Sequence, residues 1–293
     1  MKTVGGYTEL DKMRSYSTVF SSTSFSKILK GDDLSFIDAK IKRFDKDKLQ
    51  SKGITTYLHY IQYIYRQLSE NYRNEYFYKN SFINQLLLKE YGVKNTVAVN
   101  EFRVGNSIAD IVLFNGSSKA FEIKTELDSK QRLKSQIADY TKIFDECYII
   151  TDESLIDKYS KENQSIGLIA LKKLPRSVKM MEVRKAHKTE FIDSETLIRC
   201  IRTSEYKNIV SKFYGELPEM NSFNMFEICR QLMKEIPSVE LKQLFIDEVK
   251  NRRTNTLLLK SFDKELRQLA LAMQINEKKY QYLLSRLNNP INL

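Results

Sequence analysis

Hydrophobic and polar residues alternate with two different periods along the 293-residue chain. Between residues 57 and 91, apolar side chains recur every three or four positions, as they do on one face of a helix. From residue 96 to residue 186 the period changes to two, which is typical of strands. From residue 193 onward the helical period returns. The pattern therefore predicts a sheet region that lies, in sequence, between two helical regions.

The region before the strands is predicted to be partly helical. The first 55 residues are polar, the segment 15–26 is predicted to be a loop, and a short helical pattern covers residues 36–44. A helix follows whose buried stripe comprises Tyr57, Tyr60, Ile61, Ile64 and Leu68. Another helix is predicted over residues 74–90. Tyrosines are frequent here and could stack on nucleic-acid bases. Their helical spacing favours the alternative that they pack in the helix core.

The region of period two contains six predicted strands, at residues 96–104, 108–114, 119–125, 146–151, 166–171 and 178–184. Asn115-Gly116, between the second and third strands, is a strong signal for a tight turn. A helix is predicted over residues 129–144. The run at 146–151 is continuously apolar, as expected for a strand that is covered on both faces. Helices on both sides of a mixed sheet give an α/β sandwich.

Changes in pattern predict three sections of the chain. Residues 1–70 form a partly helical extension, residues 71–190 contain the sheet, and residues 191–293 form a helical C-terminal domain. The helices of the last section are predicted at residues 194–211, 220–236, 239–252, 263–273 and 276–287.

The net charge of +11 and the pI of about 9.3 favour a polyanionic partner, because binding to phosphates releases condensed counterions. Nucleic acid is the partner that this charge favours most. A membrane is not expected, since no apolar run is long enough to span a bilayer and no signal peptide is recognisable. Three widely spaced cysteines fit the reducing cytoplasm, and two histidines are too few for a His-rich metal site.

Asp110 is an acid inside an otherwise apolar strand, where a lone carboxylate is costly unless it is paired or bound to a metal. Twelve residues later, the returning strand carries Glu122 and Lys124, which lie two apart and therefore share a face. Asp110 can join that face only if the positions paired across the hairpin add up to an even number. This register requires an odd-numbered loop, or a bulge, at Asn115-Gly116.

In that register the hairpin predicts a metal site. The carboxylates of Asp110 and Glu122 and the backbone carbonyl of Ile123 are oxygen ligands suited to Mg²⁺, for which Mn²⁺ could substitute. Such an ion polarises a phosphodiester and lowers the pKa of a bound water, and Lys124 can orient or help deprotonate that water. An isolated Glu-x-Lys is usually a surface ion pair. The lone Asp110, the turn and the following helix together favour the metal site.

The hairpin and its surroundings resemble the PD-(D/E)XK, or restriction-endonuclease-like, nuclease superfamily over roughly residues 70–155. Asp110 and then Glu122-Ile123-Lys124 match its D…E-x-K arrangement, within a helix–strand–strand–strand–helix–strand order. A poorly characterised bacterial branch is the most similar, through the stretches 75–80, 101–110, 122–129 and 132–137. Ala109 stands where the name of the superfamily has Pro, a residue that many members also lack.

The resemblance implies a restriction-endonuclease-like core and further site residues. Glu75 matches a Glu on the helix before the sheet that helps bind the metal, and compensation of helix-terminal charge is its alternative role. Gln136 matches a Gln on the following helix that, with Arg132, would contact phosphate. The alternative for Gln136 and Arg132 is that they belong to an ordinary solvated helix face. Arg103 and Lys79 are the remaining predicted substrate contacts.

Several alternatives remain open. Glu101 is either part of the acidic site or a strand-end partner of Arg103. The basic C-terminal domain either grips DNA or binds a partner, and dimers are common in the superfamily, so a homodimer is an option. The expected function is a metal-dependent DNA nuclease in phage defence, restriction or repair. The alternatives are an RNA nuclease of toxin type and a non-catalytic nucleic-acid-binding or interaction protein, against which the intact Asp110, Glu122 and Lys124 argue.

Overall fold

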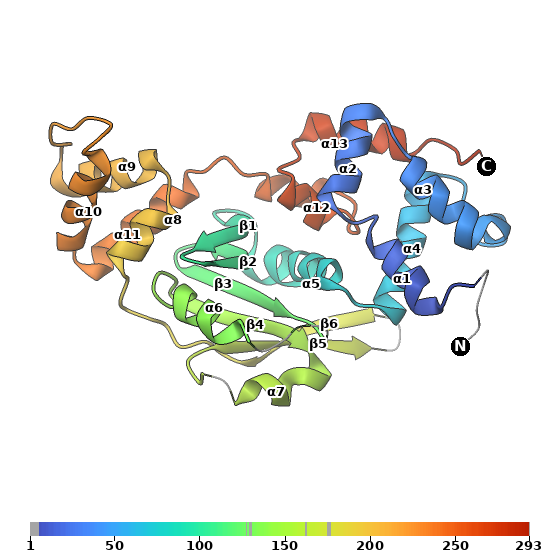
Figure 1. The fold of residues 1–293 in the computed structure, drawn as a ribbon, viewed down its shortest axis with the longest axis horizontal. Coiled ribbons are helices and arrows are strands. Elements are labelled where there is room, and N and C mark those ends of the chain that lie inside the picture. The colour runs from blue at the N-terminus through green and yellow to red at the C-terminus, as the bar shows by residue number, and fades with distance from the viewer. Residues whose placement is uncertain (1–5, 127, 129–130, 162, 175–176, 293) are drawn as a thin grey trace. The chain divides into compact units, whose positions relative to one another are not determined.

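Six strands form one continuous mixed sheet in the computed structural model, which describes residues 6–126, 128, 131–161, 163–174 and 177–292. The strands lie side by side in chain order: β1 Val97–Val104, β2 Ser107–Phe114, β3 Ser118–Lys124, β4 Glu146–Asp152, β5 Gly167–Leu174 and β6 Ser177–Arg184 (Figure 1). Strands β3, β4 and β5 are parallel, and the remaining neighbours are antiparallel. All six predicted strands are present, and the prediction of a mixed α/β fold is confirmed.

The parallel strands are joined by helical crossovers, because the chain must return to the same end of the sheet before each new strand. Helix α6 (Leu133–Tyr140) joins β3 to β4. The 3₁₀ turn η4 (Glu153–Leu155) and helix α7 (Ile156–Ser160) join β4 to β5. Helix α6 is shorter than the predicted helix at 129–144, whose first two residues lie outside the described residues.

The sheet is followed in the chain first by α8 Ser194–Cys200, α9 Thr203–Tyr214, α10 Met225–Glu235 and α11 Ser238–Lys250. The prediction of one helix over 194–211 is wrong. The chain turns to extended backbone at Ile201 and Arg202, and Glu205 then accepts a hydrogen bond from the Arg202 backbone N–H to start a new helix. This N-terminal capping interaction explains the break.

Contacts divide the chain into two units that differ from the predicted sections. The sheet unit is Lys89–Thr256, and the helical unit combines Met1–Leu88 with Leu257–Leu293. The boundaries predicted near residues 70 and 190 are not where the structure divides. Helix α8 contacts β1 and helix α11 contacts β2, so both belong with the sheet. Helical periodicity shows that a helix has a buried face, but not which core that face covers.

The helical unit begins with α1 (Glu9–Ser17) and α2 (Ser22–Gly31), where a loop was predicted over residues 15–26. That prediction is wrong because serine also starts helices. The Ser21 side chain caps α2 by accepting a hydrogen bond from the Ser24 backbone N–H. The other segments are α3 Ser35–Lys40, η1 Ile41–Asp45, η2 Lys46–Lys48, α4 Tyr57–Asn71, α5 Glu75–Phe82, η3 Ile83–Tyr91, η5 Thr256–Ser261, α12 Arg267–Ala272 and α13 Glu277–Leu287. None of the described helices is both long and apolar enough to cross a bilayer.

The tyrosines of the helical unit belong largely to its core. All five residues of the predicted stripe on α4 are buried, which confirms that prediction. The hydroxyls of Tyr16 and Tyr60 donate hydrogen bonds to the buried carboxylate of Asp45. Tyr76 is buried as well and donates to the backbone carbonyl of Glu265. Packing, rather than base stacking, therefore accounts for Tyr16, Tyr60 and Tyr76.

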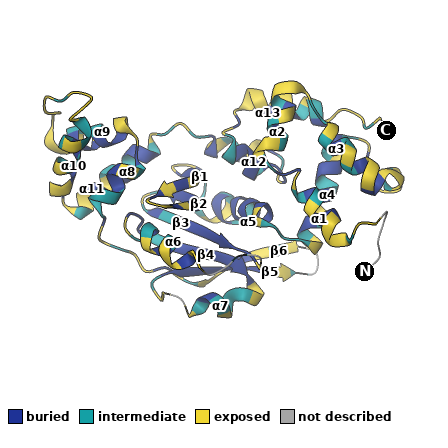
Figure 2. Ribbon diagram, viewed as in Figure 1, coloured by how far each residue is buried: buried dark blue, intermediate teal, exposed yellow. Residues whose placement is uncertain are grey.

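The core of the sheet unit lies between the sheet and its helices, and the inner strands are buried along most of their length (Figure 2). A buried ion pair ties the start of β3 to helix α11. Asp145 accepts hydrogen bonds from the backbone and hydroxyl of Ser118 and from Lys242 Nζ, at 2.7, 2.9 and 2.9 Å. Burial opposes ionisation, but these hydrogen bonds and the Lys242 charge lower the pKa of Asp145 below its usual value.

The hairpin of β2 and β3 has the register that the candidate site requires. Ile111 pairs with Phe121 and Phe114 pairs with Ser118, so paired positions add up to an even number throughout. The loop between the strands has three residues, 115–117, and Gly116 adopts a left-handed φ of 100° that suits glycine. The predicted odd-numbered loop is confirmed, and it places position 110 opposite position 122.

Strands β1 and β2 share an irregularity beside the candidate site. Phe102 with Ala109, and Val99 with Val112, are cross-strand pairs on the same packed face, although strict alternation would separate Ala109 from Val112. Between these pairs, Glu101 has a left-handed φ of 58° and is missing from the pairing with β2. Non-glycine residues rarely adopt this conformation within a strand, and such strain is common near functional sites.

We expect Glu101→Gly to raise the free energy of unfolding by about 0.5–1 kcal/mol, because glycine avoids the cost of left-handed backbone. Arg103→Gly, at another exposed position of β1, is the matched control and should lower it by about 0.5–1 kcal/mol. Urea unfolding measures both. An equal loss in the two variants would contradict the assigned strain.

Candidate active site

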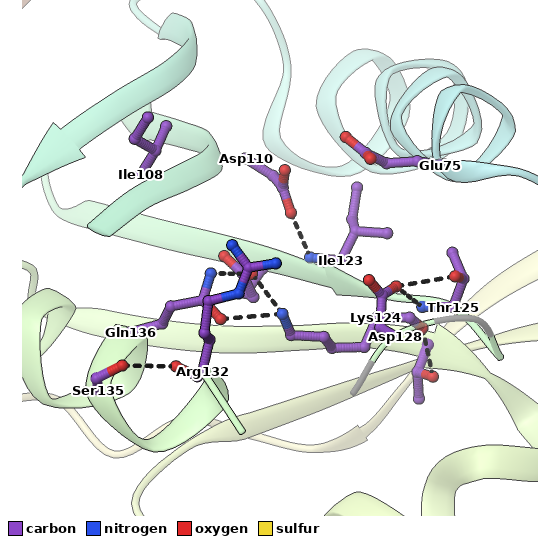
Figure 3. A network of polar contacts seen from close by, with 12 residues as sticks. Glu75, Ile108, Asp110, Ile123, Lys124, Thr125, Asp128, Arg132, Ser135 and Gln136 are labelled. Carbon is purple, nitrogen blue, oxygen red and sulfur yellow. Dashed lines mark hydrogen bonds and ion pairs between the residues drawn. The ribbon is translucent and has the colours of Figure 1, made fainter. Parts of the chain in front are cut away.

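Four of the predicted site residues come together where β2 and β3 separate. Asp110 comes from β2, Lys124 from β3 and Gln136 from helix α6 (Figure 3). Glu122 also belongs to β3. Glu122 and Lys124 are buried, and Asp110 is half-buried. The packing of α6 against the sheet unites residues that are 26 positions apart.

Asp110 satisfies the backbone of β3 just beyond the end of the hairpin ladder. The recorded pairs between β2 and β3 stop at Ile111 and Phe121. Two residues further along β3, the Ile123 N–H donates a 2.7 Å hydrogen bond to the Asp110 carboxylate, as Figure 3 shows. A carboxylate replaces the backbone partner that a longer β2 ladder would supply.

The same contact fixes the direction of the Ile123 carbonyl. In a strand, the N–H and the C=O of one residue point to the same side. Because the Ile123 N–H points to Asp110, its carbonyl also lies on the side where β2 has separated from β3. The carbonyl therefore lies on the Asp110 side of β3 and points away from β4.

Glu122 is held by three polar side chains. Its Oε1 accepts hydrogen bonds from Lys124 Nζ at 2.8 Å and from Gln136 Nε2 at 2.6 Å. Its Oε2 lies 2.8 Å from the Tyr140 hydroxyl. These contacts satisfy a carboxylate that is only 4% exposed and would otherwise be strongly unfavourable in the core.

Burial dominates the electrostatics of Glu122. Burial and the nearby Asp110 charge raise the pKa of Glu122, and they outweigh the opposing effects of Lys124 and of the Tyr140 hydrogen bond. The two carboxylates are therefore difficult to ionise together in the absence of added positive charge. A cation between them would relieve this repulsion.

Lys124 is held in place through both its side chain and its backbone. Its Nζ donates to Glu122 and, at 2.9 Å, to Gln136 Oε1. Its backbone carbonyl accepts a 2.7 Å hydrogen bond from the Thr151 hydroxyl of β4. Gln136 thus bridges the ammonium group and the carboxylate with the two ends of its amide, a role more specific than that of a solvated helix residue.

Tyr140, one of the buried residues of α6, also belongs to the site, although no role was predicted for it. Its hydroxyl lies 2.7 Å from the Ile108 carbonyl and 2.8 Å from Glu122, and it can donate its single proton to one of them at a time. Burial and the Glu122 charge raise the pKa of Tyr140, which keeps the phenol neutral. Tyr140 lies four residues after Gln136 and therefore on the same helix face, and this spacing could have predicted that it joins the site.

Two predicted site residues belong to the helical unit. Glu75 lies in the first turn of α5, and Lys79 Nζ lies 2.6 Å from its carboxylate. The Lys79 side chain is buried, whereas that of Glu75 is 61% exposed. This pair matches the alternative in which Glu75 compensates helix-terminal charge, and a role for Glu75 in metal binding stays a prediction.

The other predicted residues lie around the site without joining its polar network. Arg132 is exposed just before α6, and Arg103 is exposed on β1 opposite Ile108. Nearby, Asp128 accepts hydrogen bonds from the backbone and hydroxyl of Thr125. Glu101 is the strained residue described above.

Several arginines of the predicted C-terminal basic region make internal contacts. Arg252 forms a partly buried ion pair with Glu205 through two hydrogen bonds. Arg267 donates to backbone carbonyls and to Asn84, and Arg286 pairs with Asp32. These contacts stabilise the fold and leave DNA binding by the C-terminal region as a prediction.

The donor set of the site fits a hard divalent cation such as Mg²⁺. Asp110, Glu122 and the Ile123 carbonyl offer oxygen atoms only, which is the ligand type that this ion prefers. Within the described part of the chain, no group of three or more His, Cys, Asp or Glu side chains is spaced to hold a metal. A pair of carboxylates with waters is nevertheless a usual Mg²⁺ arrangement, because this ion retains much of its hydration.

The chain is similar to proteins from a phage and from a bacterium. Protein cII of Enterobacteria phage P4 is 23% identical over 169 residues, which cover 57% of this chain and 63% of that relative, less than two thirds of its length. A protein of unknown function from Silicibacter pomeroyi matches 49% of this chain and 93% of its own at 14% identity, with a TM-score of only 0.31. The family described as Bacteriophage P4 protein cII matches residues 68–274. The chain therefore belongs to the bacteriophage P4 protein cII family.

Proposed function

We propose that this protein is a metal-dependent nuclease that hydrolyses phosphodiester bonds, with DNA as its substrate. The observation that carries the proposal is the grouping of half-buried Asp110 with buried Glu122 and Lys124, in the register predicted for a metal-binding hairpin. A purely structural ion pair does not require a second carboxylate, whose charge makes ionisation of Glu122 harder. In this proposal the sheet and helix α6 form a restriction-endonuclease-like core.

Asp110, Glu122 and the Ile123 carbonyl would hold the ion, with Mn²⁺ as a substitute for Mg²⁺. When bound, the ion supplies polarisation of the phosphodiester and a lower pKa of bound water. Asp110 is already fixed by the Ile123 N–H, so its carboxylate loses little freedom on binding.

Lys124 would orient the attacking water and offset the charge that develops on the phosphate. Gln136 is a positioning residue, because it holds Lys124 Nζ and Glu122 Oε1 on one side chain. Tyr140 stabilises the ionised form of Glu122 when its hydroxyl donates to Oε2 rather than to the Ile108 carbonyl. Arg132 stands exposed one turn before Gln136, where it could contact the phosphate next to the cut.

The net charge of +11 supports a polyanionic substrate and does not distinguish DNA from RNA. An RNA nuclease is therefore the second candidate. A role in phage defence, restriction or repair is an expectation that follows from the DNA nuclease alone.

We expect the protein to cleave DNA in Mg²⁺ or Mn²⁺, and to lose at least about 100-fold of the cleavage rate as Asp110→Asn or Lys124→Met. Lys134→Met is the matched control, because Lys134 is an exposed lysine on α6, and it should retain the wild-type rate. Rates are measured on labelled DNA and RNA, with EDTA to remove the metal. Faster cleavage of RNA would favour the second candidate. Equal cleavage by all variants, or no cleavage of either polymer, would contradict the proposal.

Metal binding should strengthen as the pH rises. A carboxylate must lose its proton to bind a metal. Because the pKa of Glu122 is raised, the carboxyl keeps its proton at pH values above the usual Glu pKa of about 4.3. Calorimetry with Mn²⁺ between about pH 5 and about pH 8 should show rising affinity and proton release. Asp110→Asn cannot serve as a control for this pH dependence, because it removes one of the proposed metal ligands.

Tyr140→Phe tests the origin of this pH dependence. Loss of its hydrogen bond raises the pKa of Glu122 further, so the pH at which Mn²⁺ affinity reaches half its maximum should move upward. An affinity that does not vary with pH in the wild type, or that Tyr140→Phe shifts downward, would show that Glu122 is not the controlling ligand.

A further inference from the structure

Two lysines face each other across the last pair of strands. Lys172 of β5 is directly opposite Lys179 of β6. Like charges in this arrangement repel each other and destabilise the pair of strands. Lys172 forms an ion pair with Glu153 at 3.1 Å, and both side chains are about half exposed. Exposed ion pairs of this kind contribute little to the stability of the fold. Within the described residues, no hydrogen bond or ion pair is recorded for Lys179.

This lysine pair lies on the same face of the sheet as the candidate active site. Lys124 of β3 pairs with Thr151 of β4, which pairs with Ala170 of β5. Paired residues of neighbouring strands share a face, and so do residues two apart in one strand. Lys172 therefore shares the face of Lys124, and its partner Lys179 does as well.

The pair also lies at the same edge of the sheet as the candidate active site. Strands β3, β4 and β5 run in one direction, so their carboxyl ends meet at one edge (Figure 1). Lys124 is the last residue of β3, and Lys172 is two residues from the end of β5. Ligands of open α/β sheets bind outside this edge.

Strand geometry gives the separation between the two sites. With strands about 4.8 Å apart and a rise of about 3.3 Å per residue, the Cα atoms of Lys172 and Lys179 lie roughly 12 and 16 Å from that of Lys124. One strand of B-DNA rises about 3.4 Å per nucleotide, so these distances correspond to roughly four to five nucleotides.

We infer that Lys172 and Lys179 form a phosphate-binding surface for the DNA strand that is cut at Lys124, a step that rests on the proposed function. The backbone of the strand crosses the carboxyl ends of β4 and β5, and its phosphates approach the two ammonium groups. Their positive charge relieves the repulsion between the lysines, which explains why two cations stand opposite each other. Contacts of this kind hold the substrate in place without reading its sequence.

The test compares Lys172→Ala/Lys179→Ala with Lys173→Ala/Lys185→Ala, which removes the same charge. Lys173 is exposed on the opposite face of β5, and Lys185 is exposed just after β6. Binding of a labelled 20-nucleotide DNA is measured by fluorescence anisotropy in EDTA over a range of salt concentrations. Circular dichroism and thermal melting verify that both proteins fold.

We expect Lys172→Ala/Lys179→Ala to raise the Kd by about tenfold and to reduce the slope of log K against log salt by about 1.4 for single-stranded DNA, or about 1.8 for duplex DNA. The control should bind within about twofold of the wild type. Unchanged binding by Lys172→Ala/Lys179→Ala, or equal weakening by both double variants, would overturn the inference.

The outcome is separable from that of the nuclease proposal. If the wild type cleaves DNA and Lys172→Ala/Lys179→Ala binds normally, the surface is refuted and the nuclease stands. If the wild type does not cleave DNA and that variant alone loses binding, the surface stands and the nuclease is refuted. If the wild type does not bind the DNA at all, both are refuted.

Discussion

The three-residue loop between β2 and β3 sets the register on which the candidate site depends. Side chains alternate between faces along a strand, so a slip of one residue would place Asp110 on the face opposite Glu122. The early end of the β2–β3 ladder is equally important, because the Ile123 N–H then bonds to the Asp110 carboxylate instead of to a backbone carbonyl of β2. The loop, the ladder and the proposed metal site are consequences of one local geometry.

Burial makes this geometry both costly and useful. Glu122 is surrounded by Lys124, Gln136 and Tyr140, yet burial and the Asp110 charge still raise its pKa. A site tuned only for stability would replace these polar groups with apolar ones. The strained Glu101 lies across from Asp110, so the unfavourable features of the sheet unit gather at one place. That concentration is typical of functional sites, where local structure departs from the preferences of the fold.

The sequence predicted all six strands and the hairpin register, because alternation and the Asn115-Gly116 turn are local signals. It also brought Gln136 to the site through the family resemblance. It did not predict the division into units, because the helical period of α8 or α13 does not reveal which core each helix covers. Tyr140 was missed because a tyrosine in an apolar stripe usually only packs, and its hydroxyl finds Glu122 only after α6 docks on the sheet. The strain at Glu101 has no local sequence signal.

The central claim is that Asp110 and Glu122 together bind a divalent metal ion. A crystal structure of the protein in Mn²⁺, with data collected at a wavelength where manganese scatters anomalously, tests it most directly. We expect an anomalous peak within bonding distance of carboxylate oxygens of both residues, and loss of that peak in Glu122→Gln. If a crystal in saturating Mn²⁺ shows no peak there, and Lys124 and Gln136 still hold Glu122 as they do now, Asp110 and Glu122 do not form a metal site.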